Sequence, residues 1–124
     1  AGETGLGGSS LGGLVSLWLG LQHPEIFGKL AVLSPSVWWN HRHIVRYVSE
    51  VAPGLPQRPR IWLDVGDREG RRTLADAELL HTGLRAHGWR DGVDLHFEIA
   101  CDGTHDEAAW AERVRPMLRF LYPA

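Results

Sequence analysis

One serine near the start of the chain stands in a setting typical of an enzymatic nucleophile. It is the central residue of Gly8-Ser9-Ser10-Leu11-Gly12, which matches G-x-S-x-G and directly precedes an apolar helical segment. The two glycines allow a strand-to-helix turn too sharp for side chains, and such a turn strains the serine. The Leu11 N–H, at the start of the helix, would point toward a developing oxyanion. A flexible Gly/Ser linker is the alternative, but the apolar helix favours a nucleophile.

A serine nucleophile needs a general base, usually histidine, which in turn needs a carboxylate. Of seven histidines, His105 is best placed, because it lies between the last expected strand and the final helix. Asp67 and Glu69 follow the end of a parallel strand, where catalytic groups collect, and Asp64 lies within that strand. Glu69 is our first choice of acid, since Asp67 also fits a turn or cap and Asp64 a buried carboxylate. The chain order Ser10, Glu69, His105 differs from the chymotrypsin and subtilisin orders.

Aromatic and basic residues follow the next expected strand. Trp38 and Trp39 could wall a substrate pocket and stack on an aromatic acyl group, and Arg42 could bind an anionic part of the substrate. The alternative for at least one tryptophan is packing in the core. His41 and His43 flank Arg42, but no carboxylate or cysteine cluster joins them in sequence. We therefore expect neither a metal site nor a cofactor.

The composition excludes several classes of protein. The chain has 124 residues, of which 44% are hydrophobic, and its 13 basic and 15 acidic residues give a net charge of −2. One ordinary domain fits this size, and the lack of basic excess argues against a nucleic-acid partner. Cys101 is the single cysteine, so an internal disulfide is excluded. The longest uncharged run, residues 4–23, is glycine-rich and polar in places and does not read as a membrane span.

The elements that must position these residues alternate between helical and strand-like segments. We expect an opening helix that starts near Leu14 and stops before Pro24. Further strands are expected at residues 29–33, 60–65 and 93–100, and further helices at 41–51, 73–87 and 106–121. The strand at 93–100 has one polar face and suits a sheet edge. The last helix should face inward through Ala109, Trp110, Val114, Leu118 and Leu121. The alternation predicts an α/β fold in which right-handed helical crossovers join parallel strands.

Several segments together resemble one known family. They are residues 8–14, 23–28, 34–39, 63–69 and 103–110. These segments resemble the Putative esterase family of the α/β-hydrolase fold, and the tryptophan pair resembles its enterochelin (ferric siderophore) esterase branch. Feruloyl esterases and mycolyl transferases are related. The resemblance implies that Ser10 is the nucleophile, His105 the base and Glu69 the acid, with Leu11 supplying one oxyanion N–H.

The resemblance also implies an activity and its alternatives. We expect a serine ester hydrolase that acts through an acyl-enzyme on a small-molecule ester, such as a siderophore or aromatic-acyl ester. The alternatives are an acyltransferase of the same fold and a non-catalytic fragment. No membrane partner is expected, and the cytoplasm is favoured slightly over export.

The chain departs from the family in its length. Family members begin with several further strands, including the loop that gives the second oxyanion N–H. We therefore expect residues 1–124 to form a partial esterase domain that runs from the nucleophile turn to the last helix, and we expect weak activity. The nucleophile strand would cover about residues 3–7 and would leave an apolar sheet edge. Either a missing N-terminal segment or a second copy would complete that sheet.

Overall fold

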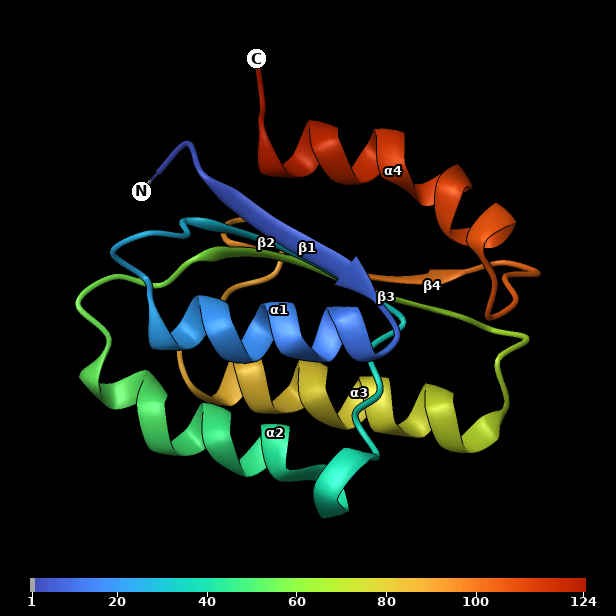
Figure 1. Ribbon diagram of the computed structural model, residues 1–124, viewed down its shortest axis with the longest axis horizontal. Helices are drawn as coiled ribbons and strands as arrows, with labels where there is room; N and C mark the ends of the chain where they lie inside the picture. Colours follow the sequence, from blue (N-terminus) through green and yellow to red (C-terminus); the bar gives the residue numbers. More distant parts are fainter. Residues whose placement is uncertain (1) are drawn as a thin grey trace.

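Four parallel strands form one sheet in the same order as they occur in the chain. The computed structural model describes residues 2–124 (Figure 1). The strands, each paired with the next, are β1 (Gly5–Ser9), β2 (Lys29–Leu33), β3 (Arg60–Gly66) and β4 (Leu95–Ala100). Because all four run in the same direction, their carboxyl ends meet at one edge of the sheet, which is where ligands bind in open α/β sheets.

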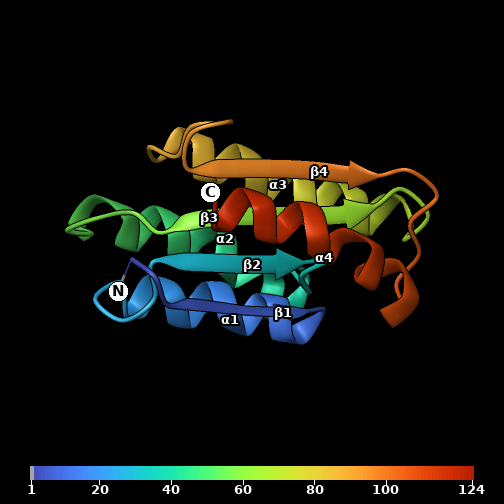
Figure 2. The same ribbon diagram turned by 90° about the horizontal axis from the view of Figure 1, so that it is seen from above.

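Helices cover both faces of this sheet. They are α1 (Leu11–Gln22), α2 (Trp39–Val51) with a short 3-10 helix (Ala52–Gly54), α3 (Arg71–Ala86) and α4 (Glu107–Leu121). The connections through α1, α2 and α3 each lead from one strand to the next strand in the same direction across the sheet. Because such crossovers are right-handed, all three helices must lie on the same face of the sheet. Figures 1 and 2 show these three helices together and α4 alone on the opposite face. The prediction of an α/β fold with a parallel sheet is confirmed.

The alternation of side chains along β2 and β3 fills two cores. Leu30 and Val32 of β2 belong to the larger core on the side of α1, α2 and α3. Ala31 and Leu33 point the other way and pack with Trp62 of β3 in the smaller core beneath α4. Because these strands are buried on both faces, they read as continuous apolar runs in the sequence.

The limits of the elements lie within a few residues of those expected. Residues 29–33 form a strand as predicted, and β4 lies at one edge of the sheet that residues 2–124 form. β1 begins at Gly5, two residues later than expected, and α1 begins at Leu11, three residues earlier. None of the helices in residues 2–124 is long and apolar enough to cross a bilayer.

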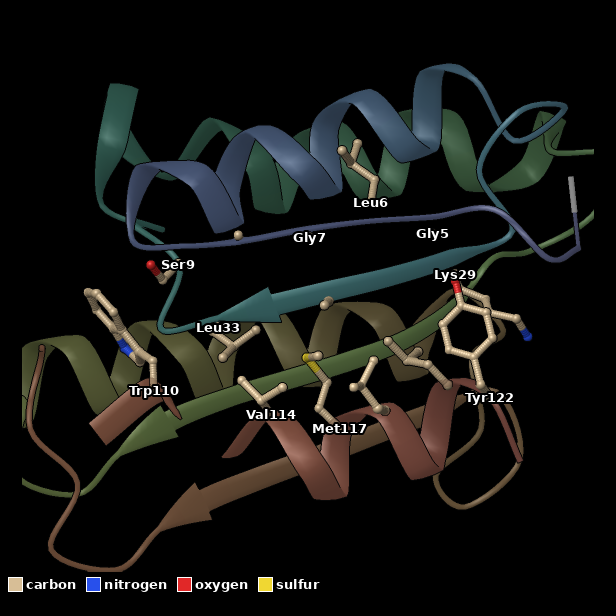
Figure 3. Close-up of a pocket in the computed structure, with 14 residues that line it drawn as sticks. Gly5, Leu6, Gly7, Ser9, Lys29, Leu33, Trp110, Val114, Met117 and Tyr122 are labelled. Atoms are coloured by element: carbon tan, nitrogen blue, oxygen red, sulfur yellow. The ribbon is translucent and has the colours of Figure 1, made fainter. Parts of the chain in front are cut away.

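The inward face of α4 differs from the prediction. Val114 and Leu118 are 40% and 47% exposed, whereas Arg113, Met117 and Leu121 are buried. The prediction followed side-chain polarity, but the helix turns Arg113 inward, where this residue finds a buried carboxylate on β3. Val114 and Leu118 instead line a groove of about 410 Å³ between α4 and β1 (Figure 3). The other two residues expected to face inward are half-buried.

Candidate active site

The turn between β1 and α1 holds Ser10 in a strained backbone conformation. Its φ of 59° and ψ of −123° are unusual for a non-glycine residue, and its N–H donates to the Leu33 carbonyl at 3.0 Å. A Cβ at Gly8 would lie 2.7 Å from the Gly12 carbonyl carbon, so Gly8 must be glycine. The expectation that Gly12 is also sterically required is wrong, because a Cβ there meets nothing within 4 Å. The crowding falls instead on Gly13, whose Cβ would lie 3.0 Å from the Leu33 oxygen.

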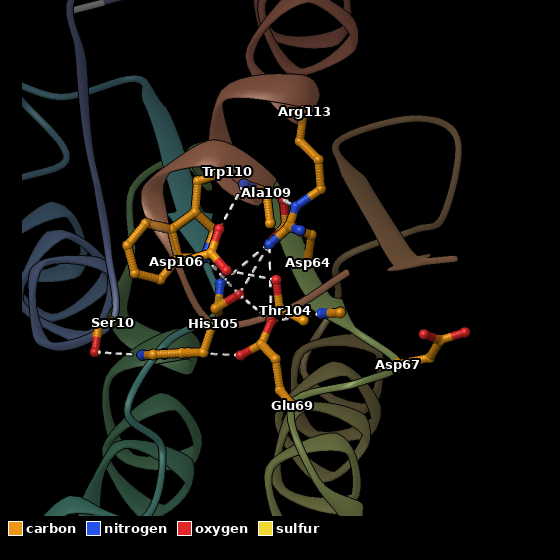
Figure 4. Close-up of polar contacts among 12 residues, drawn as sticks. Ser10, Asp64, Asp67, Glu69, Thr104, His105, Asp106, Ala109, Trp110 and Arg113 are labelled. Atoms are coloured by element: carbon orange, nitrogen blue, oxygen red, sulfur yellow. Dashed lines mark hydrogen bonds and ion pairs between the residues drawn. The ribbon is translucent and has the colours of Figure 1, made fainter. Parts of the chain in front are cut away.

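Three side chains from separate loops form one hydrogen-bonded chain. The His105 Nε2 atom lies 3.0 Å from Ser10 Oγ, and His105 Nδ1 lies 2.7 Å from Glu69 Oε1 (Figure 4). Ser10 follows β1, Glu69 follows β3 and His105 follows β4, so the shared sheet edge brings together residues up to 95 positions apart. Ser10 Oγ also lies 3.3 Å from the hydroxyl of Ser36.

The two other candidate acids lie elsewhere. Asp67 accepts a hydrogen bond from the Asp102 N–H at 2.8 Å and so ties the β3 turn to the loop that carries His105. Asp64 is fully buried and pairs with the guanidinium of Arg113 at 2.9 and 3.1 Å. Burial raises the pKa of the Asp64 carboxyl, against hydrogen bonds from Arg113 and Trp62 that lower it. Of the three carboxylates, Glu69 is the one that contacts His105.

The surroundings of Glu69 were not foreseen from the sequence. Its side chain is fully buried, whereas that of His105 is 43% exposed. Glu69 Oε2 accepts hydrogen bonds from the Gly66 N–H and the Ser34 hydroxyl, both at 2.6 Å. Arg113 donates to the same hydroxyl at 2.9 Å. An arginine on the apolar stripe of the last helix, four residues before Met117, is the signal that could have pointed to this cluster.

Leu11 is the first residue of α1 and directly follows the candidate nucleophile. The first N–H groups of a helix have no intrahelical acceptor, so the Leu11 N–H is free to bind an anion. The Leu11 side chain is 50% exposed and points away from the core. The backbone thus offers one donor beside Ser10.

The tryptophan pair is exposed. Trp38 and Trp39 are 58% and 50% exposed, so the alternative of core packing is wrong for both. Trp39 lines an apolar groove of about 460 Å³ between α1 and α2, which also contains Trp18 and His43. Trp38 is not among the residues that line this groove.

Arg42 is already paired within the chain. Its Nε donates to Asp76 Oδ1 of α3 at 2.6 Å, and the Asp76 side chain is 7% exposed. Asn40, His41 and Arg42 all have left-handed φ and ψ angles, with φ between 51° and 58°, and each such residue costs about 1–2 kcal/mol. The ion pair therefore anchors a strained turn directly after Trp39. An anionic ligand would have to use the remaining guanidinium N–H groups.

Residues 2–124 contain no cluster of three or more histidine, cysteine, aspartate or glutamate side chains that could hold a metal ion. His41 and His43 lie at the start of α2, and the aromatic ring of His43 lies 6.0 Å from that of Tyr47.

The chain is similar in sequence to known siderophore esterases. It is 36% identical over 119 residues to the iron(III) salmochelin esterase of Escherichia coli O6:H1, a match that covers 87% of this chain and 28% of that protein. It is 27% identical over 125 residues to the uncharacterized protein YbbA of Bacillus subtilis, covering 95% and 48%. The chain thus spans less than half the length of these curated relatives.

Solved structures and a family model extend the comparison to nearly the whole chain. The enterobactin esterase FES from Shigella flexneri superposes with a TM-score of 0.82 at 27% identity, over 98% of this chain and 32% of that one. The BES protein from Bacillus cereus shares the fold, with a TM-score of 0.78 at 23% identity over 97% and 45%. The sheet and its helices are therefore those of an α/β-hydrolase fold. The model of the family described as Putative esterase matches residues 1–121, and the chain belongs to this family.

Proposed function

We propose that this chain carries the catalytic triad of a serine carboxylester hydrolase, with Ser10 as nucleophile, His105 as base and Glu69 as acid. The observation that carries the proposal is the continuous chain of hydrogen bonds from Ser10 Oγ through the imidazole to the buried Glu69 carboxylate. A buried carboxylate on Nδ1 holds the tautomer in which Nε2 accepts a proton. Family membership and the similarity to siderophore esterases support the same chemistry.

The proposed reaction proceeds in two halves. Ser10 Oγ attacks the ester carbonyl carbon while Nε2 of His105 takes the hydroxyl proton. The Leu11 N–H stabilises the oxyanion, and the leaving alcohol receives the proton from His105 as the C–O bond breaks. Water then attacks the acyl-enzyme and gives its proton to His105, which returns it to Ser10 as the acid is released. The net reaction consumes one ester and one water, and needs no cofactor.

For the substrate, we propose a small-molecule ester with an aromatic acyl group, of the kind found in siderophores. Relatives named as salmochelin and enterobactin esterases support this substrate class. Trp38 and Trp39 are exposed and come shortly after the end of β2, so their rings offer surfaces on which an aromatic acyl group could stack. The free N–H groups of Arg42 would bind an anionic substituent.

We further propose that residues 1–124 are part of a larger esterase domain. The chain covers 28% of the salmochelin esterase and 32% of the enterobactin esterase structure. β1 lies at the edge of the sheet and pairs on one side only, with β2, within residues 2–124. Further strands of the same protein or a second copy would complete the sheet at this edge.

A fluorophosphonate probe, which reacts with activated serines, tests the proposal directly. Intact-mass spectrometry of the probe-treated protein should show one adduct that maps to Ser10, and the Ser10→Ala variant should show none. Hydrolysis of a simple aryl ester should fall much more in Glu69→Gln than in the matched Asp67→Asn variant. An adduct elsewhere, or equal losses in the two acid variants, would contradict the assignment.

A further inference from the structure

A buried serine that the sequence did not single out lies behind the proposed acid. Ser34 follows β2, has no exposed surface and adopts a left-handed φ of 42°. Three side chains surround its hydroxyl oxygen: Trp110 Nε1 at 3.0 Å, Arg113 Nη2 at 2.9 Å and Glu69 Oε2 at 2.6 Å. No step of the proposed reaction uses Ser34, yet its hydroxyl contacts the triad acid.

The chemistry of the neighbours fixes the direction of this hydroxyl. A serine hydroxyl has one proton to donate and two lone pairs that accept. The indole N–H of Trp110 and the guanidinium N–H of Arg113 only donate, so they fill both lone pairs. The single proton of Ser34 must then point to Glu69 Oε2, which as a carboxylate oxygen accepts. Two donors on α4 thus set the orientation of a hydroxyl on the opposite side of the acid from His105.

This orientation holds the Glu69 carboxylate in place. Oε2 accepts from the Ser34 hydroxyl and from the Gly66 N–H, and Oε1 is left to accept from His105 Nδ1. With both donors on Oε2, the carboxylate cannot swing without losing charge-assisted hydrogen bonds, which are among the stronger ones in proteins. The imidazole is in turn held with Nε2 toward Ser10.

A buried ion pair anchors Ser34 itself. Asp64 accepts from the Ser34 backbone N–H at 3.0 Å and pairs with Arg113, so it holds both Ser34 and the arginine that donates to it. The Arg113 Nη2 atom also lies 3.8 Å from Glu69 Oε2. One buried cation therefore lies against both buried carboxylates and keeps the cluster together.

We propose that Ser34 is a positioning residue for Glu69, with Trp110 and Arg113 directing its single hydroxyl proton to the acid. The proposal rests on the triad assigned above and extends it by one layer of residues. Ser34 does not touch the reacting atoms and acts through the carboxylate.

Two variants of Ser34 separate its hydroxyl from its backbone strain. Ser34→Ala removes the hydroxyl and keeps the strain, whereas Ser34→Gly removes both. Each should lower kcat for an aryl ester by about 10- to 100-fold, the equivalent of a lost hydrogen bond to a charged group, with KM within about twofold. Trp110→Phe frees one lone pair of Ser34 and should lower kcat by a smaller factor.

Trp89→Phe is the matched control. Its buried indole N–H donates at 2.9 Å to the Pro59 carbonyl, so the variant loses a comparable hydrogen bond away from the triad. Its kcat should equal that of the unaltered protein even if its stability falls. The proposal is overturned if both Ser34 variants keep a kcat within twofold of this control.

A spectroscopic measurement separates this proposal from the proposed function. Proton NMR should show a low-field resonance from the His105 Nδ1–H bonded to Glu69, and Ser34→Ala should shift or broaden it while Trp89→Phe leaves it unchanged. If the fluorophosphonate fails to label Ser10 but Ser34→Ala still shifts or broadens the resonance, the proposed function is overturned while the positioning of Glu69 by Ser34 stands. A resonance that stays unchanged in both Ser34 variants would overturn the positioning role alone.

Discussion

A methyl group added at Gly66 should displace the loop that carries His105. Gly66 is the last residue of β3, and a Cβ built on it would lie 2.2 Å from the Gly103 oxygen and 2.5 Å from its carbonyl carbon. Real Cβ contacts essentially never fall below 3.0 Å, so in Gly66→Ala the backbone at Gly103 must retreat by about 0.8 Å or more. The obstacle is backbone, which cannot rotate aside as a flexible side chain could.

The displacement converts into an expected loss of rate. Gly103 lies two residues before His105, whose Nε2 is 3.0 Å from Ser10 Oγ. A retreat of about 0.8 Å passed on in full would lengthen that contact to about 3.8 Å, beyond hydrogen-bond range. Misplacement of a reacting group by about 1 Å costs about 100-fold in rate, or roughly 2.7 kcal/mol.

The assay compares two glycine-to-alanine variants. Aryl ester turnover and the rate of fluorophosphonate labelling should both fall about 100-fold in Gly66→Ala, while circular dichroism shows an intact fold. The control is Gly83→Ala in α3, where the new Cβ would lie 3.8 Å from its nearest neighbour, an ordinary contact. It should gain about 0.5–1 kcal/mol of stability at unchanged turnover. Turnover of Gly66→Ala within twofold of this control would refute the steric reasoning.

Three further predictions concern the surroundings of the site. Arg42→Ala leaves the buried Asp76 carboxylate unpaired and should lower the free energy of unfolding by about 1–3 kcal/mol in urea titration, whereas an unchanged midpoint would remove the ion pair from the stability of the turn. Hydrogen bonds from a threonine hydroxyl and from the α4 backbone lower the pKa of Asp106, so its contribution to stability is present above the unfolded-state pKa and is lost as pH falls through the folded-state value. Asp106→Asn should flatten this acid dependence in thermal melts, and an identical pH profile would contradict it. Trp39→Ala should raise KM for aromatic esters more than for acetate esters, and equal effects on both would exclude a stacking role.

Sequence patterns were sufficient to predict those elements whose conformation depends on residues close by in the chain. The apolar run at residues 29–33 and the glycine turn around Ser10 depend on neighbours in the chain, and both lie where they were expected. The limits of β1 were harder to predict, because three glycines and one serine make up four of its five residues and hide the apolar alternation of a strand. The selection of Glu69 and His105 came from their places after expected strands and from family resemblance.

The cluster behind Glu69 had no comparable signal. Ser34, Asp64 and Arg113 come from three elements and lie as far as 79 positions apart, so no local spacing relates them. Because the prediction followed side-chain polarity, it named Val114 and not Arg113 among the inward residues of α4, whereas the structure buries Arg113 and leaves Val114 40% exposed. The burial of Arg113 depends on its ion pair with Asp64. Because Asp64 lies on β3, far from Arg113 in the sequence, the apolar pattern of the helix alone could not predict this burial.

The ion pair on α4 also bears on the charge balance at the moment of reaction. The carboxylates of Asp64 and Glu69 face the one guanidinium of Arg113, so the formal charges of this buried cluster sum to −1. In the proposed reaction His105 takes the proton from Ser10, so an imidazolium would form with its Nδ1 atom 2.7 Å from Glu69 Oε1, and the formal charges of Asp64, Glu69, Arg113 and His105 would sum to zero. If the proposed mechanism holds, this imbalance is present before the substrate arrives and proton transfer to His105 reduces it, which would be preorganisation in favour of the transition state. A second buried cation in place of Trp110 would remove that imbalance in advance and so oppose the proton transfer that the proposed mechanism requires.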